Sequence, residues 1–259
     1  MNDLFSVSGK IALVTGGSRG IGEMIAEGFV TNGVKTYISA RKAGACDATA
    51  ARLSEFGECI SIPADLSSAE GIGALVGEIR SHEKQLDILV NNAGATWGAP
   101  IGEFPESGWD KIMTINVKSP FFLTQALLPL LENAASAEDP ARIIMVGSID
   151  GLNVSQMPTF SYGPSKAAVH HLTRTLAAHL ADRNITANAI APGLFPSKMT
   201  AATIDAMGDE IIRGTPLKRA GKPADMAGVA IYLASRASSF VTGVVIPVDG
   251  GLTGAKGTL

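Results

Sequence analysis

Residues 11–22 read Ile-Ala-Leu-Val-Thr-Gly-Gly-Ser-Arg-Gly-Ile-Gly, and this stretch decides the fold. Its apolar run Ile11–Val14 leads directly into closely spaced glycines, and an amphipathic segment with Ile25, Ala26 and Phe29 follows. That order predicts a strand, a tight glycine turn and a helix. Because the start of a helix exposes unpaired backbone N–H groups at the positive end of its dipole, the junction also predicts a phosphate-binding site.

The glycine spacing is shared by several classes of protein. Gly16, Gly20 and Gly22 form the pattern G-x-x-x-G-x-G rather than the commoner G-x-G-x-x-G, and such a turn occurs in many α/β domains. Residues 16–20 also match the G-x-S-x-G nucleophile elbow of α/β-hydrolases. A hydrolase of that fold carries its catalytic histidine late in the chain. The last eighty residues here contain no histidine, which disfavours this alternative.

Composition narrows the class of protein further. The 259 residues are 46% hydrophobic and 17% charged, which predicts a large buried core. A net charge of −3 and a pI near 5.8 argue against a nucleic-acid partner. No apolar run is long enough to span a membrane, and residues 1–10 lack the regions of a signal peptide. Cys46 and Cys59 form no C-x-x-C pair and no metal-ligand cluster is present, so we expect a cytoplasmic protein without a metal.

Strand-like apolar runs alternate with helical stretches along the whole chain. The expected strands are Ile11–Thr15, Lys35–Ser39, Cys59–Pro63, Ile88–Asn91, Arg142–Gly147, Thr186–Ile190 and Val244–Val248. The expected helices are Ile21–Thr31, Ala45–Phe56, Ala69–His82, Trp109–Leu131, Tyr162–Asp182 and Pro223–Leu233. This alternation predicts one α/β domain over residues 1–259, a doubly wound Rossmann fold with a seven-stranded parallel sheet and helices on both faces. The least regular stretch, from about 193 to 219, is placed to act as a substrate lid.

Tyr162 and Lys166 are spaced to lie on one helical face. A phenol ordinarily has a pKa near 10, and a nearby ammonium group lowers that pKa by favouring the phenolate. The pair therefore suits proton transfer to a carbonyl or from an alcohol. A solvated helix surface is the alternative explanation of this spacing.

Three other polar residues occur at strand ends or inside an apolar helix. Ser148 follows the expected strand Arg142–Gly147, Asn92 belongs to the run Asn91-Asn92-Ala93-Gly94, and Asn116 lies in a long apolar helix. An asparagine in such a helix is costly unless its amide is hydrogen-bonded. A cap or an Asx turn could explain Ser148 or Asn92 alone. The whole set, in this order on a βα framework, indicates an active site.

With these motifs the chain resembles the short-chain dehydrogenase/reductase family from Lys10 to Gly251. The matching motifs are Thr15-Gly16-x-x-x-Gly20-x-Gly22, Asp65-Leu66, Asn91-Asn92-Ala93-Gly94, Asn116, Ser148, Tyr162-x-x-x-Lys166, Pro192-Gly193 and Asp249-Gly250-Gly251. The resemblance implies a nicotinamide-dependent oxidoreductase that works without a metal.

The resemblance also implies roles for individual residues. Tyr162 is the general acid in reduction, Ser148 binds the substrate oxygen, and Asn116 holds a water of the proton relay. Lys166 binds the nicotinamide ribose and lowers the pKa of Tyr162, while the backbone at Pro192-Gly193 flanks the nicotinamide. The expected cofactor-binding residues are Gly16, Ser18, Arg19, Gly20, Ile21, Gly22, Arg41, Asp65, Leu66, Asn92, Ala93, Gly94, Tyr162, Lys166, Pro192, Gly193, Phe195 and Ser197.

Two positions depart from the family pattern. Pro164 replaces a small residue, and because proline is tolerated only in the first turn of a helix, we expect that helix to begin near Tyr162. Ser197 replaces the usual threonine, and its hydroxyl can still bond the nicotinamide carboxamide.

The second expected strand carries information about the cofactor. NAD enzymes place an acid near the end of this strand, whereas residues 34–42 contain none. Arg19 and Arg41 can instead clamp a 2′-phosphate, so we expect NADP(H). The alternative is that both arginines are solvated surface charges. By the resemblance Asp65 bonds the adenine, although it could also cap a strand end.

The substrate is less clearly indicated. The chain resembles 3-oxoacyl-carrier reductases, and residues 192–200 look like those of the rhamnolipid-biosynthesis type, which implies a 3-oxoacyl thioester or β-keto ester, carried on a carrier protein or CoA. A steroid, cyclic or aryl ketone is an alternative substrate, core packing is an alternative role for the aromatic residues, and a non-catalytic dinucleotide-binding protein is an alternative function. The expected substrate residues are Ser148, Trp97, Leu152, Met157, Phe160 and Phe195, with Thr96 and Gly151 beside them.

Leucines spaced at helical intervals predict contacts between helices. They form one ridge at Leu123, Leu127 and Leu130 and another at Leu172, Leu176 and Leu180. Burial against the sheet explains part of both ridges, and the family resemblance favours helix-on-helix packing in a homotetramer.

Overall fold

The carboxyl ends of seven parallel strands meet at one edge of a single sheet. The computed structural model describes residues 3–255. The strands are β1 (Ile11–Thr15), β2 (Lys35–Ser39), β3 (Cys59–Ser61), β4 (Ile88–Asn91), β5 (Ala141–Val146), β6 (Ile185–Pro192) and β7 (Val245–Val248), in the spatial order β3-β2-β1-β4-β5-β6-β7. All six pairings are parallel, which confirms the expected doubly wound Rossmann fold.

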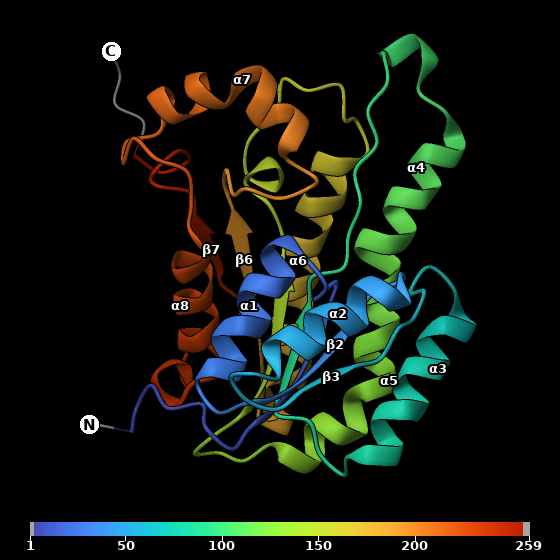
Figure 1. The fold of residues 1–259 in the computed structure, drawn as a ribbon, viewed down its shortest axis with the longest axis vertical. Coiled ribbons are helices and arrows are strands. Elements are labelled where there is room, and N and C mark those ends of the chain that lie inside the picture. Colours follow the sequence, from blue (N-terminus) through green and yellow to red (C-terminus); the bar gives the residue numbers. More distant parts are fainter. Residues whose placement is uncertain (1–2, 256–259) are drawn as a thin grey trace.

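Helices cover both faces of the sheet, and each face has its own apolar core. The helices are α1 (Gly20–Thr31), α2 (Ala43–Leu53), α3 (Ala69–His82), α4 (Glu106–Met113), α5 (Ser119–Ala134), α6 (Tyr162–Leu180), α7 (Ala201–Gly214) and α8 (Pro223–Ala234). Residues of α1, α2 and α8 form one core with the sheet, and residues of α3, α5 and α6 form the other. In Figure 1, α7 and the start of α4 extend past the end of the sheet to which β6 points.

Two parts of the chain differ from the sequence prediction. The single helix expected over Trp109–Leu131 is α4 followed by a π-helical turn, Thr114–Lys118, and then α5. The stretch expected to be irregular contains the fourteen-residue helix α7. Its Ile204, Met207 and Ile211 recur at helical spacing, and the flanking proline and glycine residues had obscured that pattern.

The strand order places a ligand crevice beside β1. Strand β1 pairs with β2 on one side and with β4 on the other, so the chain winds in opposite directions from this point. Connections that leave in opposite directions open a crevice at the carboxyl ends of the strands, where ligands of such folds bind. Within residues 3–255 no helix has the length and hydropathy needed to cross a bilayer.

Candidate active site

The glycine turn after β1 is fitted closely against the end of β4. Gly16 and Gly20 have φ values of +66° and +58°, which side chains rarely adopt. A Cβ on Gly16 would lie 2.7 Å from Asn92 Nδ2. Helix α1 begins after Arg19, whose extended backbone provides no side-chain cap. The first-turn N–H groups of α1 therefore face the crevice without a capping side chain, as a phosphate site requires.

Thr15 and Asn92 join β1 to β4 at this edge. The Thr15 hydroxyl accepts hydrogen bonds from the backbone N–H groups of Asn92 and Ala93, both at 3.0 Å. The Asn92 amide donates to the carbonyl oxygens of Thr15 (2.8 Å) and Gly16 (3.2 Å). The side chain of Asn92 thus holds the glycine turn in place.

A cavity of about 660 Å³ runs along the carboxyl edge of the sheet. Most of the expected cofactor residues line it: Gly16, Ser18, Arg19, Gly20, Ile21, Arg41, Asp65, Leu66, Asn92, Ala93, Gly94, Tyr162, Lys166 and Ser197. Gly22, Pro192, Gly193 and Phe195 do not contribute to its lining. The structure therefore brings together residues as far apart in the sequence as Gly16 and Ser197.

Tyr162 and Lys166 of the expected catalytic set line the inner end of this cavity, and Ser148 directly follows Gly147, which also lines it. Helix α6 begins at Tyr162, as the position of Pro164 predicted. Lys166 is 5% exposed, and its ammonium donates to the carbonyl oxygen of Val146 at 2.8 Å. Its Nζ atom lies 5.6 Å from the centroid of the Tyr162 ring. Ser148 is 8% exposed and follows β5 directly.

Burial sets the protonation of this group. The pKa of Tyr162 is raised to about 12, mainly by burial; a hydrogen bond with Ser148 opposes the increase and the negative charge of Asp150 contributes to it. Burial also lowers the pKa of Lys166 to about 8. The net pKa of Tyr162 is thus raised, because the loss of solvation outweighs the other contributions; the lowering effect expected of Lys166 stays a prediction. The phenol is protonated at neutral pH, as a general acid must be.

Three hydrogen bonds join the amide of Asn116 to other parts of the chain. Asn116 lies in the π-helical turn and is 2% exposed. Its Oδ1 atom accepts from the backbone N–H of Ala95 at 2.9 Å, and its Nδ2 atom donates to the Ala95 carbonyl (3.0 Å) and to Ser165 Oγ (2.9 Å). The side chain of Asn116 thus positions the β4 loop against α6, and the expected relay water at this residue stays a prediction.

Basic and polar side chains line the end of the cavity next to β2. Arg19 and Arg41 both line it, as does Ser39 at the end of β2. The Ser39 hydroxyl is buried and has no hydrogen-bond partner. Asp65 Oδ1 accepts from the backbone N–H (3.0 Å) and the hydroxyl (2.7 Å) of Ser67, and these bonds, aided by the charge of Arg41, lower the pKa of Asp65. Asp65 thus caps its own turn through Oδ1, and its expected bond to the adenine stays a prediction.

Three of the expected substrate residues are exposed to solvent, whereas Trp97 packs against a helix. Leu152, Met157 and Phe160 are 41%, 40% and 38% exposed in the segment between β5 and α6. Trp97 lies against Gly108 of α4, with the ammonium of Lys111 5.3 Å from its ring centroid.

Phe195 is the exception among the expected substrate residues. It is 1% exposed, belongs to the core with α1 and α8, and packs onto Gly221. The prediction that Phe195 lines the substrate or cofactor site is wrong for its side chain, because the ring is buried in the core against Gly221.

The chain matches one family model and many known proteins. Residues 16–253 match the family described as "Enoyl-(Acyl carrier protein) reductase". The chain is 50% identical to the "Rhamnolipids biosynthesis 3-oxoacyl-[acyl-carrier-protein] reductase" of Pseudomonas aeruginosa, over 97% of this chain and 99% of that protein. It is 34% identical to the 5-keto-D-gluconate 5-reductase of Escherichia coli, over 97% and 98% of the two chains.

A solved structure agrees with these matches. The structure described as "Pseudomonas aeruginosa RhlG/NADP active-site complex" superposes with a TM-score of 0.94 at 49% identity. The superposition covers 98% of this chain and all of that one. The fold and the order of the motifs are thus those of a known group of dinucleotide-dependent enzymes.

Sequence reasoning missed three residues near the catalytic group. Lys111 lines the cavity, and Asp150 raises the pKa of Tyr162. His170, which follows Lys166 by one helical turn, is 3% exposed and neither of its ring nitrogens has a hydrogen-bond partner. A Cβ on Gly147 would collide with its imidazole, so the ring packs directly behind the strand end that carries Ser148. Only the helical spacing from Lys166 could have indicated this position.

His170 makes the fold sensitive to acid. Burial lowers its pKa to about 4; the backbone of Gly151 opposes this shift, and the charges of Lys166 and Arg174 add to it. Between about pH 6.5 and pH 4 the unfolded chain binds a proton at this residue and the folded chain does not, so we expect the free energy of unfolding to fall by up to about 3 kcal/mol as the pH drops through this range. Urea unfolding of wild type and His170→Leu across this range measures the contribution, which the variant should lack.

His179→Gln serves as the matched control because His179 is exposed on the same helix. It should keep the wild-type dependence of stability on pH. An equally steep dependence in His170→Leu and wild type would show that His170 does not cause it.

Proposed function

Because this chain belongs to the short-chain dehydrogenase/reductase family, we propose that it uses NADPH to reduce a ketone to a secondary alcohol, with a 3-oxoacyl thioester or β-keto ester as substrate. The observation that carries the proposal is the buried, protonated Tyr162 beside Ser148 and Lys166 at the inner end of the cavity. The relative from Pseudomonas aeruginosa, described as a 3-oxoacyl reductase, supports the choice of substrate.

The residues along the cavity fit a phosphorylated dinucleotide. The glycine turn and the uncapped start of α1 suit the pyrophosphate. Arg19 and Arg41 suit the 2′-phosphate, and the buried, unpartnered hydroxyl of Ser39 supplies a further polar contact at that end. A relative solved as an NADP complex supports this assignment.

The proposed chemistry divides between the cofactor and three side chains. When bound, the dinucleotide supplies the hydride that reduces the carbonyl carbon. Tyr162 donates its phenolic proton to the carbonyl oxygen, and Ser148 donates a hydrogen bond to the same oxygen and orients it. The ammonium of Lys166 stabilises the phenolate that forms, and it is held in place by the carbonyl of Val146. Ser148 and Tyr162 must therefore both reach the substrate oxygen.

The segment from about 193 to 219, with helix α7, is the proposed substrate lid. Its Ser197, Lys198 and Met199 line the cavity, so it borders the site directly. The Ser197 hydroxyl lies 3.0 Å from the Thr200 hydroxyl, which keeps this turn ordered, and Ser197 is proposed to reach the nicotinamide carboxamide.

Reduction of another lipophilic ketone is the second candidate function. The exposed apolar residues Leu152, Met157 and Phe160 favour it as much as they favour an acyl chain. A non-catalytic dinucleotide-binding role has less support, because Tyr162 and Lys166 line the cavity and Ser148 bonds to Tyr162. Assays with NADPH and a panel of ketones separate these possibilities.

The chain is also proposed to form a homotetramer, but on other residues than those expected. Both leucine ridges are largely used within the chain, since Leu123 and Leu127 are fully buried and Leu176 is 9% exposed. Phe121 and Phe122 on α5 are instead 37% and 43% exposed, and their rings pack edge to face. Exposed aromatic pairs of this kind favour association. Light scattering should report four times the 26.7 kDa monomer mass, and a monomer at micromolar concentration would refute the assembly.

Removal of the Tyr162 hydroxyl tests the proton donor. We expect Tyr162→Phe to lower kcat by about 10²–10⁴-fold, because general acid catalysis typically contributes that much. NADPH binding, measured by the fluorescence of the nucleotide, should persist. Tyr232→Phe is the matched control and should keep its activity, because Tyr232 packs beside Phe5 and does not line the cavity. Retention of more than half of wild-type turnover by Tyr162→Phe would refute the role of Tyr162.

Arg19 and Arg41, which line the cofactor cavity with Ser39 of β2, are proposed to determine the choice between NADPH and NADH. Hydrogen bonds to charged groups contribute about 1.5–3 kcal/mol each, so Arg41→Ala should lower kcat/KM for NADPH about tenfold or more. The value for NADH, which lacks the phosphate, should barely change. Arg80→Ala, an exposed arginine of α3, should alter neither value. An equal loss with both nucleotides in Arg41→Ala would exclude Arg41 as a phosphate ligand.

A further inference from the structure

A second hollow, separate from the cofactor cavity, lies between α4 and the segment that precedes α6. It measures about 410 Å³ and is lined by Ile101, Phe104, Pro105, Glu106, Trp109 and Phe160. We refer to these six residues as the outer groove. Five of them are apolar and Glu106 alone carries a charge. Single exposed apolar residues are normal on a protein surface, but a contiguous set marks a binding surface.

The aromatic side chains of the outer groove are arranged as a preformed wall. The rings of Phe104 and Phe160 meet edge to face, with centroids 5.8 Å apart and planes at 78°. Even so, Trp109 is 41% exposed, Phe160 is 38% exposed and Ile101 is 80% exposed. These side chains therefore pack together on one side and present apolar surface to solvent on the other.

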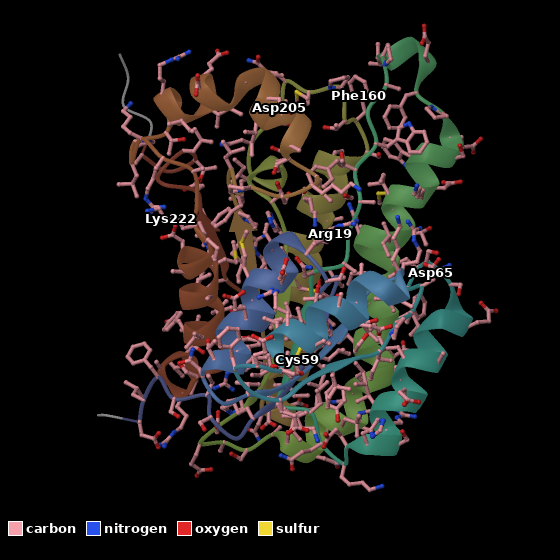
Figure 2. The ribbon with its side chains drawn as sticks, in the orientation of Figure 1. Arg19, Cys59, Asp65, Phe160, Asp205 and Lys222 are labelled. Atoms are coloured by element: carbon pink, nitrogen blue, oxygen red, sulfur yellow. The ribbon has the colours of Figure 1, made fainter. Side chains whose placement is uncertain are left out.

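The outer groove adjoins the catalytic group through short connections. Phe160 precedes Tyr162 by two residues, and the backbone N–H of Ala99 donates to the carbonyl of Pro158 at 3.1 Å, which holds the two walls of the groove together. Figure 2 shows Phe160 between the tips of α4 and α7, at the end of the molecule where both helices pass the sheet, with Arg19 farther down. The groove thus lies at the end of the molecule that carries α7 and the start of α4, away from Arg19.

Trp97 links the two hollows from the inside. A Cβ on Gly108 would lie 3.0 Å from the Trp97 indole, so the indole packs against the backbone of α4 next to Trp109. Lys111, which lines the cofactor cavity, lies over the Trp97 ring. Trp97 thus packs between the helix that borders the outer groove and a residue of the cofactor cavity, and Phe160 of the groove lies two residues before Tyr162.

We propose that the outer groove binds the distal methylene groups of an unbranched acyl chain, so that the enzyme prefers medium or long 3-oxoacyl groups to short ones. This inference rests on the proposed function. The chemistry of the lining favours an alkyl chain over a sugar or a hydroxylated ring, because only Glu106 offers a polar side chain and a polar ligand would leave its hydroxyl groups unpaired. The shared position of Phe160, in the groove and next to Tyr162, favours a substrate over a second copy of the chain.

Chain-length kinetics test the proposal. With NADPH, kcat/KM for 3-oxoacyl-CoA thioesters should rise from four to ten acyl carbons by about fourfold for each methylene that enters the groove, the gain expected from burying one methylene. In Ile101→Ser and in Trp109→Ala the ratio of kcat/KM for the ten-carbon to the four-carbon substrate should fall about tenfold. Phe56→Ser, which removes a 58% exposed phenylalanine outside the groove, should leave this ratio unchanged.

Fluorescence provides a readout that does not depend on turnover. The chain has only two tryptophans, Trp97 and Trp109. The variant Trp97→Phe leaves Trp109 as the single reporter of the outer groove. Decanoyl-CoA should shift its emission to the blue in the presence of NADP⁺, whereas acetyl-CoA should not.

The possible results of these experiments distinguish acyl binding in the outer groove from the proposed reductase activity. A ratio that does not depend on chain length, or that the groove variants leave unchanged, would overturn the proposal, as would an unshifted Trp109 emission with decanoyl-CoA. Variants that lower the oligomeric mass while keeping the ratio would show that a second copy occupies the groove. A Trp109 shift without turnover of any 3-oxoacyl thioester would support the groove and contradict the proposed function.

Discussion

The site depends on one buried amide. Asn116 accepts one hydrogen bond from the backbone of Ala95 and donates two, to the Ala95 carbonyl and to Ser165 Oγ, and it is 2% exposed. These bonds connect the loop after β4 to the helix that carries Tyr162 and Lys166. A buried amide that lost these partners would incur a desolvation cost of about 1–3 kcal/mol. The π-helical turn in which Asn116 lies is the local distortion that aims this amide at both segments.

Burial links the architecture to the proposed chemistry. The carboxyl ends of β1, β4 and β5 bring the glycine turn, the Ala95 loop and Ser148 to one edge, and α6 closes over them. The same closure removes water from Tyr162 and Lys166, which raises the pKa of the phenol and lowers that of the ammonium. The site therefore holds a neutral acid next to a weakly solvated cation. This arrangement favours proton donation to a substrate oxygen, because the phenolate that forms has its stabilising charge nearby.

Features that depend on short sequence motifs could be predicted from the sequence. Features that depend on contacts between segments distant in the sequence could not. The seven strands and Tyr162, Lys166 and Ser148 were predictable because each is announced by a local pattern of apolar, glycine or polar residues. The inward turn of Phe195 was not, because it depends on packing against Gly221 of a later segment. The raised pKa of Tyr162, the burial of His170 and the outer groove likewise arise from segments that meet only in the folded chain.

Transfer of an isotope label tests the central claim most directly. Wild-type protein should be incubated with NADPH that carries deuterium at the transferring position and with 3-oxodecanoyl-CoA in ordinary water, and the product analysed by mass spectrometry. We predict a 3-hydroxyacyl product with one deuterium on the carbinol carbon, since the hydride comes from the nucleotide and the proton from Tyr162 and solvent. A reduced product without deuterium, or no reduced product under these conditions, would contradict the account.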